Sequence, residues 1–131
     1  MRLGRPIWIA FLLFPLAGCS SNNEGRIEDT LWVCEAQTVN GNNLPHGALV
    51  LAFRADGSMT CTRQFTDAYP GRYTLSMGDY VTFRFDRPYG DTKATVHTEK
   101  ITINGDKMTM VDADGTVVKF TRAKEGDVPK S

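Results

Sequence analysis

The sequence predicts an all-β fold, an eight-stranded antiparallel up-and-down β-barrel. Three observations support this prediction. Turn-forming residues recur roughly every eight to twelve residues between positions 30 and 122. The segments between them are rich in β-branched and aromatic residues, several of which alternate with polar ones. No interval is long enough for the crossover helix that parallel strands require.

The turn signals divide the region into strands. Each signal contains glycine, asparagine or aspartate, which accept tight-turn geometry, or a proline with a preset φ. They are Asn40-Gly41, Asp56-Gly57, Pro70-Gly71, Gly78-Asp79, Pro88-Tyr89-Gly90, Asn104-Gly105-Asp106 and Asp114-Gly115. We therefore expect strands at 30–38, 47–54, 58–65, 71–77, 80–86, 94–103, 107–112 and 116–122.

The expected strands each have an apolar or aromatic content that fits one buried face. In chain order, the residues that define this face are Trp32; Leu49, Leu51 and Phe53; Met59, Cys61 and Phe65; Val81, Phe83 and Phe85; Ile101 and Ile103; and Met108 and Met110. Segments 71–77 and 116–122 are assigned from their content and their flanking turns. One apolar and one polar face describe a meander, and closure into a barrel removes its exposed edges.

The first 18 residues have the pattern of a secretory signal peptide. Arg2 and Arg5 form a basic start, and an apolar run over 7–17 follows. As a helix this run would span ~16 Å, about half of a ~30 Å hydrocarbon core. It is therefore too short to be a transmembrane helix.

The segment Leu16-Ala17-Gly18-Cys19 resembles the lipobox of bacterial lipoproteins. The resemblance implies cleavage before Cys19 and attachment of diacylglycerol to its thiol, which anchors the chain in a membrane. It places the protein on the exported side of the cell membrane or of an outer membrane. The outer membrane is favoured because Ser20, rather than an aspartate, follows the cysteine. The expected organisation is a signal peptide at 1–18, a lipidated flexible tether at 19–28, a domain at 29–123 and a disordered tail at 124–131.

The order of short motifs in the domain is similar to that of a known family. These motifs are Thr30-Leu31-Trp32, Leu44-Pro45-His46-Gly47, Leu51-Ala52-Phe53-Arg54-Ala55-Asp56-Gly57, Gly71-Arg72-Tyr73, Gly78-Asp79-Tyr80-Val81-Thr82-Phe83, Ile103-Asn104-Gly105-Asp106-Lys107-Met108-Thr109-Met110, Asp112-Ala113-Asp114-Gly115 and Phe120-Thr121-Arg122. Together they resemble the small lipocalin-like (calycin) domain of bacterial lipoproteins of unassigned function. The resemblance implies that Trp32 packs at the closed end of the barrel with Arg122 over it. Thr30 stands where larger lipocalins have glycine. A second similarity is to the META-type lipoprotein domain, whose usual Gly-Cys-Asn segment is missing at Thr60-Cys61-Thr62.

The remaining cysteines leave two alternatives open. An even pair in an exported protein indicates a disulfide between Cys34 and Cys61. The predicted strand order separates them by two strand spacings, about 9–10 Å, beyond the ~7 Å that a bridge spans. The alternative is a pair of buried thiols.

The sequence contains no recognisable catalytic or metal-binding motif, so we predict neither a catalytic residue nor a cofactor. His46 and His97 are the only histidines, and they are interpreted as structural, with a copper or zinc role as the less favoured alternative. The 15 Lys and Arg balance the 15 Asp and Glu, which removes the usual driver of nucleic-acid binding.

The function expected from these features is that of a non-enzymatic envelope lipoprotein. Its domain binds a small apolar ligand or serves a structural role, and a filled core is favoured at this chain length. The alternative is a protein-binding module, such as an enzyme inhibitor or an assembly accessory. Its contact residues would be Tyr69, Arg87 and Tyr89, because tyrosine and arginine are favoured interface anchors.

Overall fold

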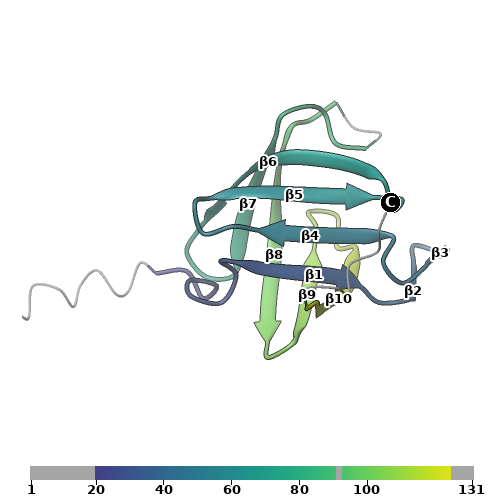
Figure 1. The fold of residues 1–131 in the computed structure, drawn as a ribbon, viewed down its shortest axis with the longest axis horizontal. Coiled ribbons are helices and arrows are strands. Elements are labelled where there is room, and N and C mark those ends of the chain that lie inside the picture. Colours follow the sequence, from purple (N-terminus) through teal and green to yellow (C-terminus); the bar gives the residue numbers. More distant parts are fainter. Residues whose placement is uncertain (1–19, 91–92, 125–131) are drawn as a thin grey trace, which may run out of the picture.

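The computed structural model describes residues 20–90 and 93–124, and the predicted eight-stranded antiparallel barrel is confirmed (Figure 1). Its strands are β1 (Thr30–Cys34), β4 (Leu49–Phe53), β5 (Ser58–Arg63), β6 (Asp67–Leu75), β7 (Tyr80–Phe85), β8 (Val96–Asn104), β9 (Lys107–Val111) and β10 (Val117–Arg122). From β4 to β10 each strand pairs with the next, and β1 closes the barrel by pairing with both β4 and β10. No helix of the described residues is long and apolar enough to cross a membrane.

The expected strand at 30–38 is shorter than predicted and is followed by a separate hairpin. This hairpin consists of β2 (Gln37–Val39) and β3 (Asn42–Leu44), joined by Asn40 and Gly41 with φ of 51° and 79°. The side-chain amide of Gln37 fastens it to the barrel, since it donates to the carbonyl of Lys119 at 2.9 Å and accepts from the backbone N–H of Lys119 at 2.9 Å. The amide thus makes the two bonds that a neighbouring strand would make with β10.

The predicted turn at Pro70-Gly71 is wrong, because both residues lie inside β6, opposite Thr60 and Met59. A Cβ on Gly71 would lie 2.3 Å from the carbonyl oxygen of Arg84 on β7. The glycine therefore permits a close approach of two strands, which is a common reason for glycine within a sheet. The turn itself falls earlier, where Gln64 and Phe65 adopt φ of 50° and 69°. Phe65 is consequently exposed and not on the buried face that its spacing predicted.

The barrel interior is filled by the predicted apolar face. The largest fully buried side chains include Trp32, Phe53, Phe120, Leu51, Met59, Ile101 and Met108. Aromatic rings pack edge to face along one side, with Phe53 and Tyr73 5.1 Å apart between ring centres. Such pairs stabilise a core by about 0.5–1.5 kcal/mol each beyond burial alone.

The segment before β1 packs on the barrel, and the prediction of a flexible tether is corrected for residues 21–28. Ser21 forms a parallel bridge with Gly78, and the side-chain amide of buried Asn23 donates to the carbonyl of Ile101 at 3.0 Å. Ile27 has no exposed surface. One apolar side chain and hydrogen-bonding asparagines hold this polar stretch, which composition alone does not reveal. Cys19 and residues 125–131 lie outside the described residues.

Candidate functional site

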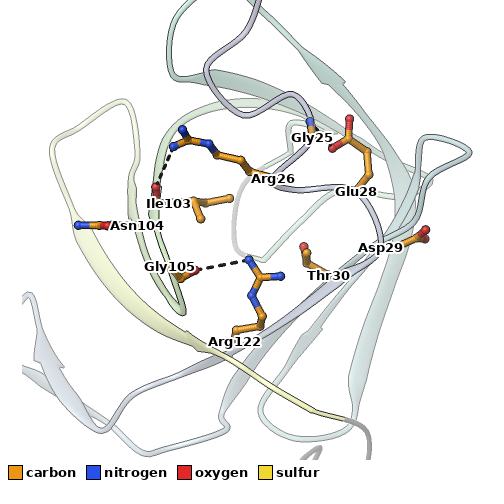
Figure 2. A pocket seen from close by; sticks show the side chains of 9 residues that line it. All are labelled: Gly25, Arg26, Glu28, Asp29, Thr30, Ile103, Asn104, Gly105 and Arg122. Atoms are coloured by element: carbon orange, nitrogen blue, oxygen red, sulfur yellow. Dashed lines mark hydrogen bonds between the residues drawn. The ribbon is translucent and has the colours of Figure 1, made fainter.

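A pocket of about 420 Å³ opens at the end of the barrel where β1 begins (Figure 2). The segment before β1 lines one side, and the turn between β8 and β9 lines the other. The lining residues are Gly25, Arg26, Glu28, Asp29, Thr30, Ile103, Asn104, Gly105 and Arg122. We call it the Arg26–Arg122 pocket, after the two guanidinium groups on its sides.

Arg122 forms the inner side of the pocket and covers the closed end of the barrel. Its guanidinium carbon lies 4.9 Å from the ring centre of Trp32, which confirms the predicted pair. Its Nη2 donates to the carbonyl of Gly105 at 3.4 Å, and its Nε lies 3.6 Å from a carboxylate oxygen of Asp106. That buried Nε makes no hydrogen bond among the described residues. Because the Nε is buried and faces Asp106, the group of Arg122 that remains for an anion is Nη1, which makes no hydrogen bond among the described residues.

Thr30 forms the floor of the pocket and explains the departure from glycine at this position. Its hydroxyl donates to the carbonyl of Ile27 and accepts the indole N–H of Trp32 at 2.8 Å. The threonine therefore satisfies the polar atom of a fully buried tryptophan. It also joins the segment before β1 to the core of the barrel.

The outer side of the pocket carries groups of both charges. Arg26 is exposed, and its Nη1 donates to the carbonyl of Ile103 at 3.5 Å. The carboxylate of Glu28 accepts from the backbone N–H of Gly25 at 2.9 Å. Asp29 accepts from the backbone N–H of Ala55 at 3.0 Å. Two cations and two anions thus surround one opening, so the site suits a ligand that carries both charges.

A second hollow adjoins the first on the far side of Arg26. It has a volume of about 290 Å³ and is lined by Asn22, Asn23, Arg26, Asp79, Thr102 and Ile103. Arg26 and Ile103 line both hollows, so the two lie next to each other at this end of the barrel.

The residues predicted to contact a protein partner lie at the opposite end, and two of them are turned inward. Tyr69 is buried, and Tyr89 stacks on Phe85 with ring centres 4.8 Å apart. Arg87 is exposed, but it lies 3.8 Å over the ring of Tyr69 and pairs with Asp67 at 3.1 Å. Tyr69 and Tyr89 therefore complete the apolar face inside the barrel, and of the three residues Arg87 is the exposed one.

A cavity of about 40 Å³ remains inside this end of the barrel, where Glu99 and Tyr89 face it together with Leu51, Cys61, Phe83, Phe85, His97 and Met110. This volume accommodates about one water molecule. Glu99 is 9% exposed, and burial raises the pKa of its carboxyl to about 7, with a smaller contribution from the charges of Asp112 and Asp114.

The two cysteines are free and buried, so the alternative of a disulfide is not realised. Cys34 is the last residue of β1, and Cys61 lies on β5. Strand β4 separates β1 from β5 in the barrel. The thiol of Cys34 donates to the backbone carbonyl of Pro45 at 3.3 Å. Its sulfur accepts from the backbone N–H of Leu49, also at 3.3 Å. The sulfur of Cys61 lies 3.3 Å from the hydroxyl of Tyr89. Burial raises the pKa of the Cys61 thiol to about 12.

Within residues 20–90 and 93–124, no three histidine, cysteine or acidic side chains gather in a way that would hold a metal ion. A ring nitrogen of His97 instead lies 3.2 Å from the carbonyl oxygen of Ala94. Arg26 and Glu28 are not among the residues predicted from sequence, because both fall in the stretch interpreted as a tether. Ile27 is the one aliphatic residue of that stretch, and its burial places Arg26 and Glu28 against the domain.

Comparison with known proteins yields a fold and no family. No family model matches, and no curated protein matches significantly. An uncharacterized protein from Bacteroides eggerthii is 15% identical, with a TM-score of 0.55 over 74% of this chain and 99% of the other. A protein from Burkholderia xenovorans solved by NMR is 19% identical, with a TM-score of 0.51 over 78% of this chain and 87% of the other. At these identities the likeness shows the fold alone.

Proposed function

We propose that this chain is a lipid-anchored module of the bacterial cell envelope, a lipocalin-like barrel that serves as a filled, non-enzymatic scaffold and acts through its outer surface. The observation that carries the scaffold role is the size of the interior cavity, about 40 Å³. Pockets that hold small ligands usually measure about 300–1,000 Å³. A structural or surface-binding role is therefore favoured over transport of an apolar ligand inside the barrel.

The lipobox supports the anchored location. Ala17 and Gly18 are small residues directly before Cys19, whose acylation would hold the domain on the exported side of a membrane. Ser20 at the next position favours an outer membrane over the cell membrane. The domain then faces the periplasm or the exterior.

The test of this proposal is expression of the full chain in a Gram-negative host. Mass spectrometry of the purified protein should find a mature N-terminus at Cys19 with thioether-linked diacylglycerol, and membrane fractions should contain the protein. Cys19→Ser should remain an uncleaved precursor, whereas Cys61→Ser should be processed and anchored like wild type. A soluble wild-type protein with an unmodified N-terminus elsewhere would refute the anchored location.

The scaffold role has its own test. Native mass spectrometry of the lipoprotein, after exposure to fatty acids and other small apolar ligands, should detect no ligand retained beyond its own acyl chains. A retained stoichiometric ligand, lost when Tyr89→Trp fills the small cavity, would instead establish a carrier.

A further inference from the structure

The packed N-terminal segment determines which end of the barrel an anchor at Cys19 would hold against a membrane. Asn22 donates from its backbone N–H to the carbonyl of Gly78 at 2.8 Å and from its side chain to Asp79 at 2.8 Å. Ser21 forms a bridge with Gly78 as well. Cys19 is two residues before Ser21, and two extended residues span at most about 7 Å. An acyl chain on Cys19 would therefore hold this end of the barrel against the lipid surface.

The Arg26–Arg122 pocket opens at this same end. Its lining includes Gly25, Arg26 and Glu28, which follow Cys19 within nine residues. Asp29 reaches the turn between β4 and β5 through the N–H of Ala55. In Figure 1 the N-terminal segment and the β2–β3 hairpin lie at opposite ends of the barrel. With an anchor at Cys19 the pocket would thus face the headgroups, whereas the hairpin would face away from them.

Two exposed side chains strengthen this orientation. Met77, in the turn between β6 and β7, is 67% exposed, and Tyr80, at the start of β7, is 50% exposed. Both adjoin Gly78 and Asp79, which hold the segment nearest the anchor. An exposed methionine beside a tyrosine suits the boundary between headgroups and acyl chains, where aromatic side chains are enriched.

We propose that the Arg26–Arg122 pocket binds the headgroup of a zwitterionic phospholipid, with the phosphate between Arg26 and Arg122 and the ammonium at Glu28. This inference rests on the proposed anchoring through Cys19. Figure 2 shows both guanidinium groups bordering the opening, with Ile103 between them in that view.

The charges of the pocket favour this headgroup over a purely anionic one. The Nη1 of Arg122 makes no hydrogen bond among the described residues, and the side chain is 37% exposed, so this group can donate to a phosphate oxygen. Guanidinium groups match phosphate geometry well. Glu28 has one carboxylate oxygen in a bond to Gly25, so the other oxygen is available to an ammonium group. Asp29 and Asp106 add negative charge near the pocket. This charge would repel a strongly anionic membrane surface of the kind that binds polybasic segments.

The headgroup is tested with the mature lipoprotein in dodecyl maltoside micelles by NMR titration. Glycerophosphoethanolamine should shift the Gly105 amide and the Arg122 Nε–H saturably. Arg26→Gln should weaken that binding by about tenfold, whereas Arg84→Gln, which removes an exposed charge on β7, should not change it. Inorganic phosphate should bind about tenfold more weakly than the headgroup. Equal binding of both probes would make this a free-phosphate site and overturn the proposal, as would the absence of shifts.

The orientation is tested with the same protein in vesicles of phosphatidylethanolamine and phosphatidylcholine. Nitroxide labels go on Ser76→Cys, in the turn between β6 and β7, and on Asn43→Cys, in the β2–β3 hairpin; both positions are exposed. A nickel-chelating lipid should relax the label at 76 strongly and the label at 43 weakly. Equal relaxation of the labels at 76 and 43, in vesicles that carry the protein, would overturn the orientation but not the anchoring through Cys19. Failure of the protein to float with the vesicles would overturn the anchor and the inference together.

Discussion

The hydroxyl of Thr30 accepts a hydrogen bond of 2.8 Å from the indole nitrogen of Trp32. Trp32 has no exposed surface, so its N–H would otherwise be buried without a partner. Arg122 lies over the same indole ring. The three side chains together close the end of the barrel from which the N-terminal segment emerges.

Thr30→Val tests this closure because it removes the hydroxyl and keeps the shape. We expect the free energy of unfolding to fall by about 1–3 kcal/mol, the cost of leaving a buried donor unsatisfied. Thr30→Ser keeps the hydroxyl and should lose less than about 1 kcal/mol. Urea unfolding of the two variants provides the measurement. Equal losses in both would mean that the hydrogen bond contributes nothing.

Ile27→Ala tests whether the segment before β1 belongs to the domain. The side chain is fully buried, and truncation of a buried isoleucine costs about 2–5 kcal/mol. Glu24→Ala, at an exposed position three residues earlier, should stay within about 0.5 kcal/mol of wild type. The unfolding midpoints of the two variants in urea provide the measurement. An unchanged midpoint in Ile27→Ala would restore the view of residues 21–28 as a loose tether.

The barrel could be predicted from sequence because alternation reports directly which face of a strand is buried. Val81, Phe83 and Phe85 lie inside as their spacing indicates. The same method fails where a residue has a second role. Pro70-Gly71 has turn composition, yet Gly71 is needed because β7 approaches β6 too closely there for a side chain. Only the three-dimensional register reveals that contact.

The site was less predictable than the fold. Trp32 and Arg122 followed from a family resemblance, whereas Arg26 lies in a polar stretch that carries no periodic signal. Tyr69 and Tyr89 are candidate protein-contact residues by composition, because tyrosines in loops are favoured interface anchors. Tyr89 in fact folds back over the barrel mouth, with its hydroxyl 3.3 Å from the sulfur of Cys61. Side-chain direction in a loop depends on its backbone path, which local composition does not specify.

Glu99 should make the stability of the protein depend on pH. Burial raises the pKa of its carboxyl from 4.5 to about 7 in the folded protein. Between these two values the folded state therefore binds more protons than the unfolded state, and the free energy of unfolding falls as pH rises through this window. We expect a loss of about 1–2 kcal/mol that is complete above pH 7. Thermal or urea unfolding from pH 4 to 8 measures it.

The matched variant for this effect is Glu99→Gln, which retains the size of the side chain and removes its titration. The difference in unfolding free energy between variant and wild type should change in favour of the variant as pH rises from about 4.5 to 7. Other titrating groups, including Asp112 with its own raised pKa, cancel largely in this comparison. Parallel pH profiles for the two proteins would show that Glu99 does not ionise within the window.

Tyr89 should control the chemical reactivity of Cys61. The pKa of this thiol is raised to about 12 chiefly by burial, and its hydrogen bond with Tyr89 lowers the pKa in part. At pH 8 only about one thiol in ten thousand is then ionised, and the thiolate is the reactive form. Tyr89→Ala removes a ring that covers the cavity and admits water, so alkylation of Cys61 by iodoacetamide should accelerate at least about tenfold.

The contrast with Tyr89→Phe separates covering from hydrogen bonding. Phenylalanine keeps the ring stacked on Phe85 but loses the bond that favours the thiolate, so Cys61 should react no faster than in wild type. Peptide mass spectrometry follows each cysteine separately, and buried Cys34 reports on global unfolding. A rise at both cysteines would attribute the alanine effect to unfolding. A rise at Cys61 alone identifies Tyr89 as the side chain that keeps solvent from the barrel interior.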